Sequence, residues 1–100
     1  MINLNDLAEQ SLIIAEKRGL ATDTLSTLKH CAGEVLEAVD ADNALSSCTE
    51  ARDLYEEGLA LELADIIICA LTACAGKGIN VELALMKAMQ KNAGRAYEKS

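Results

Sequence analysis

The chain has no proline, phenylalanine or tryptophan among its 100 residues, and two tyrosines are its only aromatic side chains. Half of it is nevertheless apolar (51%), so a core has to be built from Leu, Ala, Ile, Val and Met. Ala and Leu favour helices, whereas sheets need β-branched and aromatic residues separated by turn residues. These features predict an all-α fold. At this length the whole chain, residues 1–100, forms a single domain.

The charge balance excludes several kinds of partner. Nine Lys and Arg residues against sixteen Asp and Glu residues give a formal net charge of −7. This sign is wrong for binding a nucleic-acid polymer or an anionic membrane directly. A ligand that carries phosphate would need a divalent cation to offset the carboxylates.

The sequence indicates a cytoplasmic protein with no membrane span. The N-terminal residues lack the basic and then apolar pattern of a signal peptide. Residues 59–75 are very apolar, but Glu62 and Asp65 interrupt them and the run is shorter than a span. The cysteines lack CxxC or Cys/His spacing, which favours reduced thiols in apolar surroundings. They are Cys31, Cys48, Cys69 and Cys74.

Apolar periodicity and cap residues predict four helices, at about 5–18, 23–40, 53–75 and 80–97. The candidate cap residues are Asn3 or Asn5 for the first helix, Thr22 or Asp23 for the second and Asn80 for the fourth. Gly19 ends the first helix, Gly76-Lys77-Gly78 ends the third, and the polar segment 42–52 is expected to be a loop. The apolar stripe of the second helix consists of Leu25, Leu28, Ala32, Val35 and Val39. The predicted architecture is an antiparallel four-helix bundle. Because the third helix is apolar on every side, we expect dimerisation to complete the bundle, as a homodimer or a dimer of dimers.

Two acidic pairs carry the most chemical information. Glu34 and Glu37 lie three residues apart in the second helix, and Glu62 and Asp65 lie three apart in the third. Residues at this spacing share one helix face, so each pair presents two repelling carboxylates side by side. The second pair sits in an apolar helix, where carboxylates either become protonated or bind cations. Clustered oxygen ligands suit Mg²⁺ or Mn²⁺.

Other sites fit the residues less well. A di-iron carboxylate bundle uses Glu-x-x-His motifs, but the single histidine, His30, belongs to none, and it is expected at the surface or behind the ligands. No Gly-rich phosphate loop of the P-loop class is present. Glu34 and Glu37 taken alone could also form an ordinary solvated helix face.

The fourth helix supplies positive charge. Lys87, Lys91 and Arg95 recur every four residues and form one basic ridge, with Asn92 next to it. The ridge is either a solvated helix end, where basic residues suit the helix dipole, or a clamp for phosphate oxygens.

With these motifs in this order, residues 28–95 resemble the MazG-like nucleotide pyrophosphohydrolases, an all-α NTP pyrophosphatase family. The resemblance depends on GEVLEAV, LELADIIICAL, the KGIN turn and KNAGR. It implies that four carboxylates hold Mg²⁺, and that a nucleoside triphosphate is cleaved between its α and β phosphates. The implied ligands are Glu34, Glu37, Glu62 and Asp65.

The resemblance also bears on the fourth helix, where Asn92 and Arg95 match the terminal motif as substrate-binding residues. Relatives often carry Lys where this chain has Ala88, so Lys87 or Lys91 would have to substitute for it. Glu34 or Glu37 is expected to take a proton from the attacking water. A phosphoribosyl-ATP pyrophosphatase would use the same chemistry. The alternative from another class is a non-catalytic helical module that binds nucleotide and metal without turnover.

Overall fold

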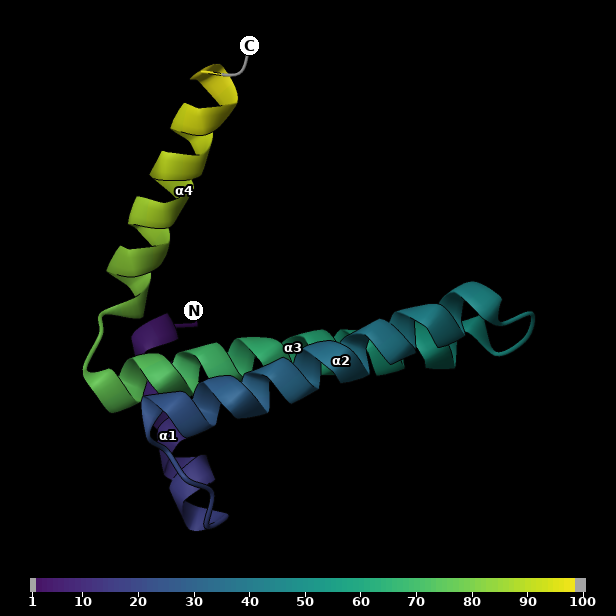
Figure 1. Cartoon of the computed structure of the whole chain (residues 1–100), viewed down its shortest axis with the longest axis horizontal. Coiled ribbons are helices and arrows are strands. Elements are labelled where there is room, and N and C mark those ends of the chain that lie inside the picture. Colours follow the sequence, from purple (N-terminus) through teal and green to yellow (C-terminus); the bar gives the residue numbers. More distant parts are fainter. Residues whose placement is uncertain (1, 99–100) are drawn as a thin grey trace.

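The computed structural model describes residues 2–98, with side chains through residue 95. It contains α1 (Leu4–Lys17), α2 (Thr24–Ser47), α3 (Arg52–Lys77) and α4 (Val81–Glu98), and no strand lies within the described residues. The predicted all-α fold is confirmed. α2 and α3 form a long antiparallel hairpin, α1 crosses the base of this hairpin, and α4 projects away from it (Figure 1).

The predicted cap residues begin and end the helices. The side chain of Asn3 accepts hydrogen bonds from the backbone N–H groups of Asn5 and Asp6. Asp23 accepts one from the N–H of Ser26 at 3.0 Å, so each side chain satisfies amide groups that a helix start leaves unpaired. Gly78 ends α3 at a φ of 68°, a left-handed conformation that suits glycine.

The predicted loop over 42–52 is mostly wrong, because α2 continues to Ser47 and only residues 48–51 form the turn into α3. Half-buried Ala41, Leu45 and Cys48 continue, three or four residues apart, the row that begins further back in α2. Packing of this row against α3 therefore outweighs the low helix propensity of the polar residues between them.

The contact between the two long helices follows a coiled-coil spacing, which we call the seam. Its buried and half-buried residues alternate in steps of four and three, as in a heptad repeat. On α2 they are Thr27, Cys31, Glu34, Ala38, Ala41 and Leu45, and on α3 they are Leu59, Glu62, Ile66, Cys69 and Ala73. Two glutamates thus occupy positions that a coiled coil normally gives to apolar residues.

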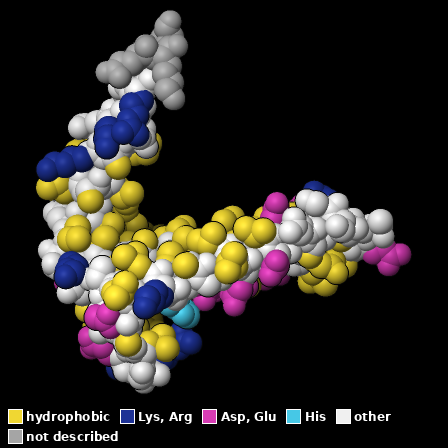
Figure 2. Space-filling view, in the orientation of Figure 1, with side chains coloured by type: hydrophobic (Ala, Val, Ile, Leu, Met, Phe, Trp, Pro, Cys, Tyr) yellow, Lys and Arg dark blue, Asp and Glu magenta, His cyan; other side chains and the backbone are white. Residues whose placement is uncertain are grey.

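The apolar stripe of α2 does not face α3. Leu25, Leu28, Val35 and Val39 are between 43% and 63% exposed, and Ala32 is exposed as well. The small and polar seam residues of α2 face α3, because they allow the two helices to approach closely. The large apolar residues of α2 point outward. Figure 2 shows hydrophobic side chains along the visible surface of the hairpin and of α4.

The buried core lies where α1, α3 and the start of α4 meet. It consists of Ala8, Leu71 and Val81, with Leu4, Leu7, Cys74 and Ala75 packed against them. Beyond this junction α4 leaves the other helices, and the radius of gyration of the chain is 16.1 Å. A compact domain of this length has a radius of about 13 Å. The single chain is therefore extended rather than compact.

Three hydrogen bonds hold the starts of α1 and α4 together. Asn5 Nδ2 donates to Asn80 Oδ1 at 3.0 Å, and Asn5 Oδ1 accepts from the N–H of Val81 at 2.9 Å. The N–H of Leu4 donates to Glu82 Oε1 at 3.0 Å. We call this arrangement the clasp. It joins two helix starts and thereby fixes the direction in which α4 leaves the hairpin.

We expect Asn5→Ala to lower the free energy of unfolding by about 1–2 kcal/mol, because it removes two hydrogen bonds and leaves the N–H of Val81 unpaired. Urea denaturation measures the loss, and hydrogen exchange at Val81 should become faster. Asn43→Ala, on the exposed surface of α2, is the matched control and should change stability by less than about 0.5 kcal/mol. Equal stability of the two variants would contradict a structural role for the clasp.

α3 is longer than the apolar run expected from the sequence. At 26 residues it is long and apolar enough to cross a membrane, judged by length and composition alone. A core helix of a soluble assembly has the same composition, and Glu62 and Asp65 lie near the middle of α3. Most of α3 is exposed in the single chain, whereas a helix that is apolar on every side is normally buried on every side.

Candidate metal centre

Three carboxylates from the two hairpin helices meet at the seam. One oxygen each from Glu34, Glu62 and Asp65 lies within 4.8 Å of the others. Glu34 comes from α2, whereas Glu62 and Asp65 come from consecutive turns of α3. The antiparallel register thus brings together one member of the first acidic pair and both members of the second.

The two seam glutamates have unsatisfied oxygens. Glu34 Oε2 and Glu62 Oε2 are both buried and have no hydrogen-bond partner among the described residues. The side chain of Glu34 is only 13% exposed. Buried polar atoms without a partner are uncommon in native proteins, since each loses its hydration without compensation. A cation bound between these oxygens would supply the missing partner.

Burial and mutual repulsion make both seam carboxyls harder to ionise. Loss of hydration, followed by the negative charge of Glu37 and then that of Asp65, raises the pKa of Glu34 above its ordinary value. Loss of hydration and then the charge of Glu37 likewise raise the pKa of Glu62. The charge of Glu37 contributes to both shifts, so we group it with the other three carboxylates and call the four residues the acidic cluster; Glu34, Glu62 and Asp65 are the members whose oxygens lie within 4.8 Å of one another. Glu37 is its exposed member on α2.

Two further groups border the acidic cluster. His30 Nε2 lies 3.2 Å from Glu34 Oε1, and its half-exposed ring sits one turn before Glu34. The thiol of Cys69 is buried near Cys31, and this burial raises its pKa to about 11. All four cysteines are free, so no disulfide links the hairpin helices.

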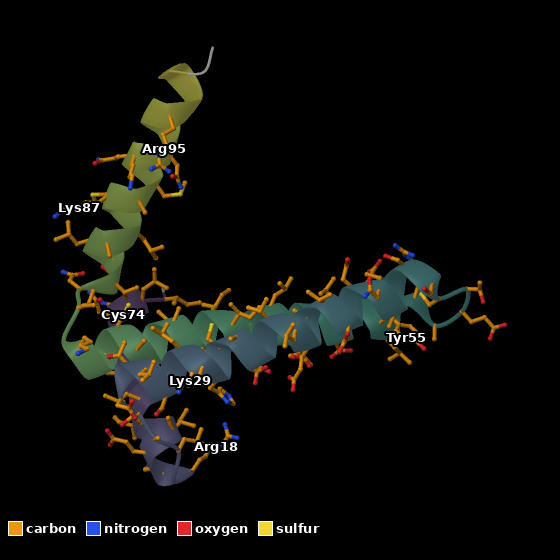
Figure 3. All side chains as sticks on the ribbon, viewed as in Figure 1. Arg18, Lys29, Tyr55, Cys74, Lys87 and Arg95 are labelled. Carbon is orange, nitrogen blue, oxygen red and sulfur yellow. The ribbon has the colours of Figure 1, made fainter. Side chains whose placement is uncertain are left out.

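The predicted phosphate-binding residues do not join the acidic cluster within one chain. Lys87, Lys91, Asn92 and Arg95 all lie on α4 and are all exposed. Figure 3 labels Lys87 and Arg95 on this helix, away from the hairpin. α4 contacts α1 near the clasp and then extends outward.

A cavity of about 460 Å³ opens beside the acidic cluster, and Glu34 and Asp65 form part of its wall. It lies between α1, the α1–α2 connection and the hairpin, and Arg18 and His30 also line it. The three buried polar residues of the described chain, Ser11, Thr27 and Thr72, all face this cavity. The volume is within the range of small-molecule sites, about 300–1,000 Å³.

The sequence did not reveal this cavity. Its lining comes from three separate segments, and no local spacing connects Ser11 or Arg18 with α3. One signal was present on α2, where Thr27, Cys31 and Glu34 follow the same seam spacing. A polar row at that spacing indicates a buried polar channel between the helices.

Comparison of the chain with protein-family models, curated proteins and solved structures found no match. The assignment of a function therefore depends on the geometry of the acidic cluster and of the cavity beside it.

We expect the metal-free protein to become more stable as the pH falls from neutral. The folded state binds protons on Glu34 and Glu62 more tightly than the unfolded chain, since both pKa values are raised. Their contribution to the free energy of unfolding therefore grows as the pH falls through the raised values, and it is complete below the ordinary value of 4.5.

Urea denaturation in a metal chelator measures this dependence. The double variant Glu34→Gln/Glu62→Gln removes both groups, so its stability should rise less than that of the wild type over the same interval. If the stabilities of the wild type and of the double variant change equally with pH, the two carboxyls do not titrate as proposed.

Proposed function

We propose that this protein is a magnesium-dependent nucleoside triphosphate pyrophosphohydrolase, which cleaves (d)NTP into (d)NMP and pyrophosphate. The observation that carries the proposal is the pair of buried, unpartnered glutamate oxygens at the seam, beside Asp65. Two glutamates at these positions do not stabilise the contact between α2 and α3, because apolar residues there would pack without repulsion.

The donor set favours a hard divalent cation. Only carboxylate oxygens converge at the acidic cluster, and among the described residues no group with three ligand atoms includes a thiol or an imidazole. Carboxylate oxygens suit Mg²⁺, with Mn²⁺ as a substitute, whereas zinc sites use thiolate and imidazole ligands. Glu34, Glu62 and Asp65 would hold the cation, with Glu37 as a fourth ligand.

The residues around the cluster have distinct roles in this chemistry. Bound Mg²⁺ would neutralise phosphate charge and make a water molecule more acidic. Glu37, the fourth ligand, is the exposed carboxylate of α2, so it could also take a proton from the attacking water. Glu34 is the other candidate base. It is buried and contacts His30, which favours a ligand role instead.

The cavity is suited to the rest of the substrate. A triphosphate held at Glu34 and Asp65 can extend its sugar and base into the adjoining space of about 460 Å³. Among the described residues no Phe, Tyr or Trp lines this space, so a base would be contacted by hydroxyl groups, by aliphatic side chains and by the imidazole ring of His30. The proposed location is the cytoplasm, where triphosphates and reduced thiols are found.

Pyrophosphate release from a mixed dNTP pool with Mg²⁺ tests the proposal. We expect pyrophosphate release that depends on the metal and on the acidic cluster. Single canonical and modified triphosphates are then screened. A protein that binds a non-hydrolysable triphosphate analogue but releases no pyrophosphate would instead be a binding module. Release of orthophosphate would contradict cleavage between the α and β phosphates.

We expect Mg²⁺ or Mn²⁺ to raise the melting temperature. A ligand that binds only the folded state, at a hundred times its Kd, stabilises it by about 2.7 kcal/mol. In a domain of this size that corresponds to a rise of roughly 10 °C or more. Thermal melts with Mg²⁺, and with K⁺ at matched ionic strength as the control, measure the effect. An unchanged melting temperature at millimolar Mg²⁺ would count against the metal site.

A further inference from the structure

One permanently charged cation borders the cavity beside the acidic cluster. Among the described residues, Arg18 is the only Lys or Arg that lines this cavity, and no described carboxylate forms an ion pair with it. His30 lines the cavity too, but its Nε2 already pairs with Glu34. Glu34 and Asp65 would be engaged by the cation. The guanidinium of Arg18 is therefore available to a ligand that enters the cavity.

The end of α1 fixes Arg18 at this place. Arg18 is the C-cap residue of α1, and Gly19 after it has a φ of 74°. The N–H of Gly19 donates to the carbonyl oxygen of Glu16 at 3.0 Å. The N–H of Leu20 donates to the carbonyl oxygen of Ala15, also at 3.0 Å. These bonds form a Schellman motif, in which glycine takes the left-handed conformation. Ala15 and Leu20 line the cavity as well, so the motif that carries Arg18 is part of the cavity wall (Figure 3).

Arg18 differs from the hydroxyl groups of the cavity, because a guanidinium can donate hydrogen bonds but cannot accept them. The hydroxyls of the two lining serines and of Thr27 can do both, so they fit either kind of partner. Thr72 is buried, and its hydroxyl already donates to the carbonyl oxygen of Ile68 at 2.9 Å, which leaves its oxygen as an acceptor. The cavity therefore presents one fixed donor, Arg18, and one fixed acceptor, Thr72.

A fixed donor distinguishes two classes of nucleotide base. Guanine, thymine and uracil have a ring carbonyl beside a ring N–H, whereas adenine and cytosine have an amino group beside an unprotonated ring nitrogen. A guanidinium can pair with the carbonyl oxygen, as arginine does with O6 of guanine in DNA. An amino group facing the same guanidinium would lose its hydration without finding an acceptor, which is costly in an enclosed site. The acceptor of Thr72 suits the ring N–H of the first class.

We propose that Arg18 selects triphosphates whose base has a ring carbonyl beside an N–H, as in guanine, thymine and uracil. The inference rests on the proposed function, in which the cation holds the triphosphate at Glu34 and Asp65 and the base enters the cavity. It adds the class of base that is accepted. Arg18 lies in α1, outside the residues 28–95 that carry the family resemblance.

Assays with single triphosphates and Mg²⁺ test this selectivity. We expect kcat/KM for dGTP and dTTP to exceed that for dATP and dCTP by about tenfold or more, the usual contribution of a hydrogen bond to a charged group. Arg18→Gln should remove most of this preference, because an amide both donates and accepts. Arg18 is exposed, so the fold should tolerate the change. Arg52→Gln, at the exposed start of α3 where Arg52 pairs with Glu56, is the matched control and should keep the preference.

Equal kcat/KM values for the four triphosphates would overturn the proposal. So would an Arg18→Gln variant that lowers all four values by the same factor, because the guanidinium would then bind phosphate and not the base. Calorimetry with the α,β-imido analogues of dGTP and dATP and Mg²⁺ gives a second readout. The wild type should bind the dGTP analogue more tightly, and Arg18→Gln should bind the two analogues with similar Kd. A wild type that releases no pyrophosphate from any triphosphate would contradict the proposed function, and the ratio of the two Kd values would still decide whether Arg18 selects the base.

Discussion

Glu62→Gln and Asp65→Asn should each abolish magnesium-dependent turnover while the metal-free protein stays folded and at least as stable as the wild type. Turnover should fall by roughly a hundredfold or more, since loss of even an outer partner of a metal ligand costs 10- to 100-fold. Stability should not fall, because each substitution removes one of several repelling carboxylates. The combination is unusual, because most substitutions destabilise a protein.

Two measurements on the same samples separate the effects. A pyrophosphate assay reports turnover, and circular dichroism melts in a chelator report the metal-free fold. Glu57→Gln, the same substitution at an exposed position of α3, is the matched control and should leave both values unchanged. Full activity in Asp65→Asn would remove that residue from the metal site, and a large loss of stability in Glu62→Gln would show that its carboxyl has a structural partner.

Much of the fold and of the acidic cluster could be predicted because the signals are local. Asp23 and Gly78 mark helix ends through the conformations that they favour, and three-residue spacing places Glu62 and Asp65 on one face. The antiparallel hairpin then brings Glu34 to them, since α2 and α3 are long and joined by a short turn.

The features that could not be predicted depend on contacts between segments that are far apart in the sequence. The direction of α4 follows from hydrogen bonds between Asn5 and residues 80–81, which are about 75 positions apart and leave no periodic trace. The apolar periodicity of α2 showed correctly that Leu28 and Val35 share a face, but it could not show whether α3 or another molecule covers that face. Amphipathicity identifies a face that needs burial and does not identify the partner.

From the size of its exposed surface we expect the chain to form a dimer or a dimer of dimers at low micromolar concentration. The chain exposes 7468 Å². A compact monomer of 10.6 kDa exposes about 5,500 Å². The difference of roughly 2,000 Å² per chain is large enough for an obligate interface. Within the helices, the most exposed large apolar residues lie on α2, α3 and α4 and include Leu36, Leu54, Leu61, Ile67 and Met89.

Leu28→Glu and Ile67→Glu should therefore convert the assembly to monomers. Both side chains are more than half exposed in one chain, so a monomer would tolerate glutamate there with little change in stability. Within an interface, the same substitution buries a charge without a partner and adds repulsion to an acidic protein. Ser46→Glu, at an exposed polar position of α2, is the matched control and should remain a dimer.

Light scattering with size-exclusion chromatography measures the mass, and vesicle flotation asks whether the apolar surface of α3 enters a membrane instead. We expect a mass of at least twice 10.6 kDa and no flotation. A stable, active species of 10.6 kDa would show that the exposed residues need no cover from a second copy of the chain. If the wild type floats with the vesicles and Ile67→Glu abolishes the flotation, then lipid, and not a second copy of the chain, covers α3.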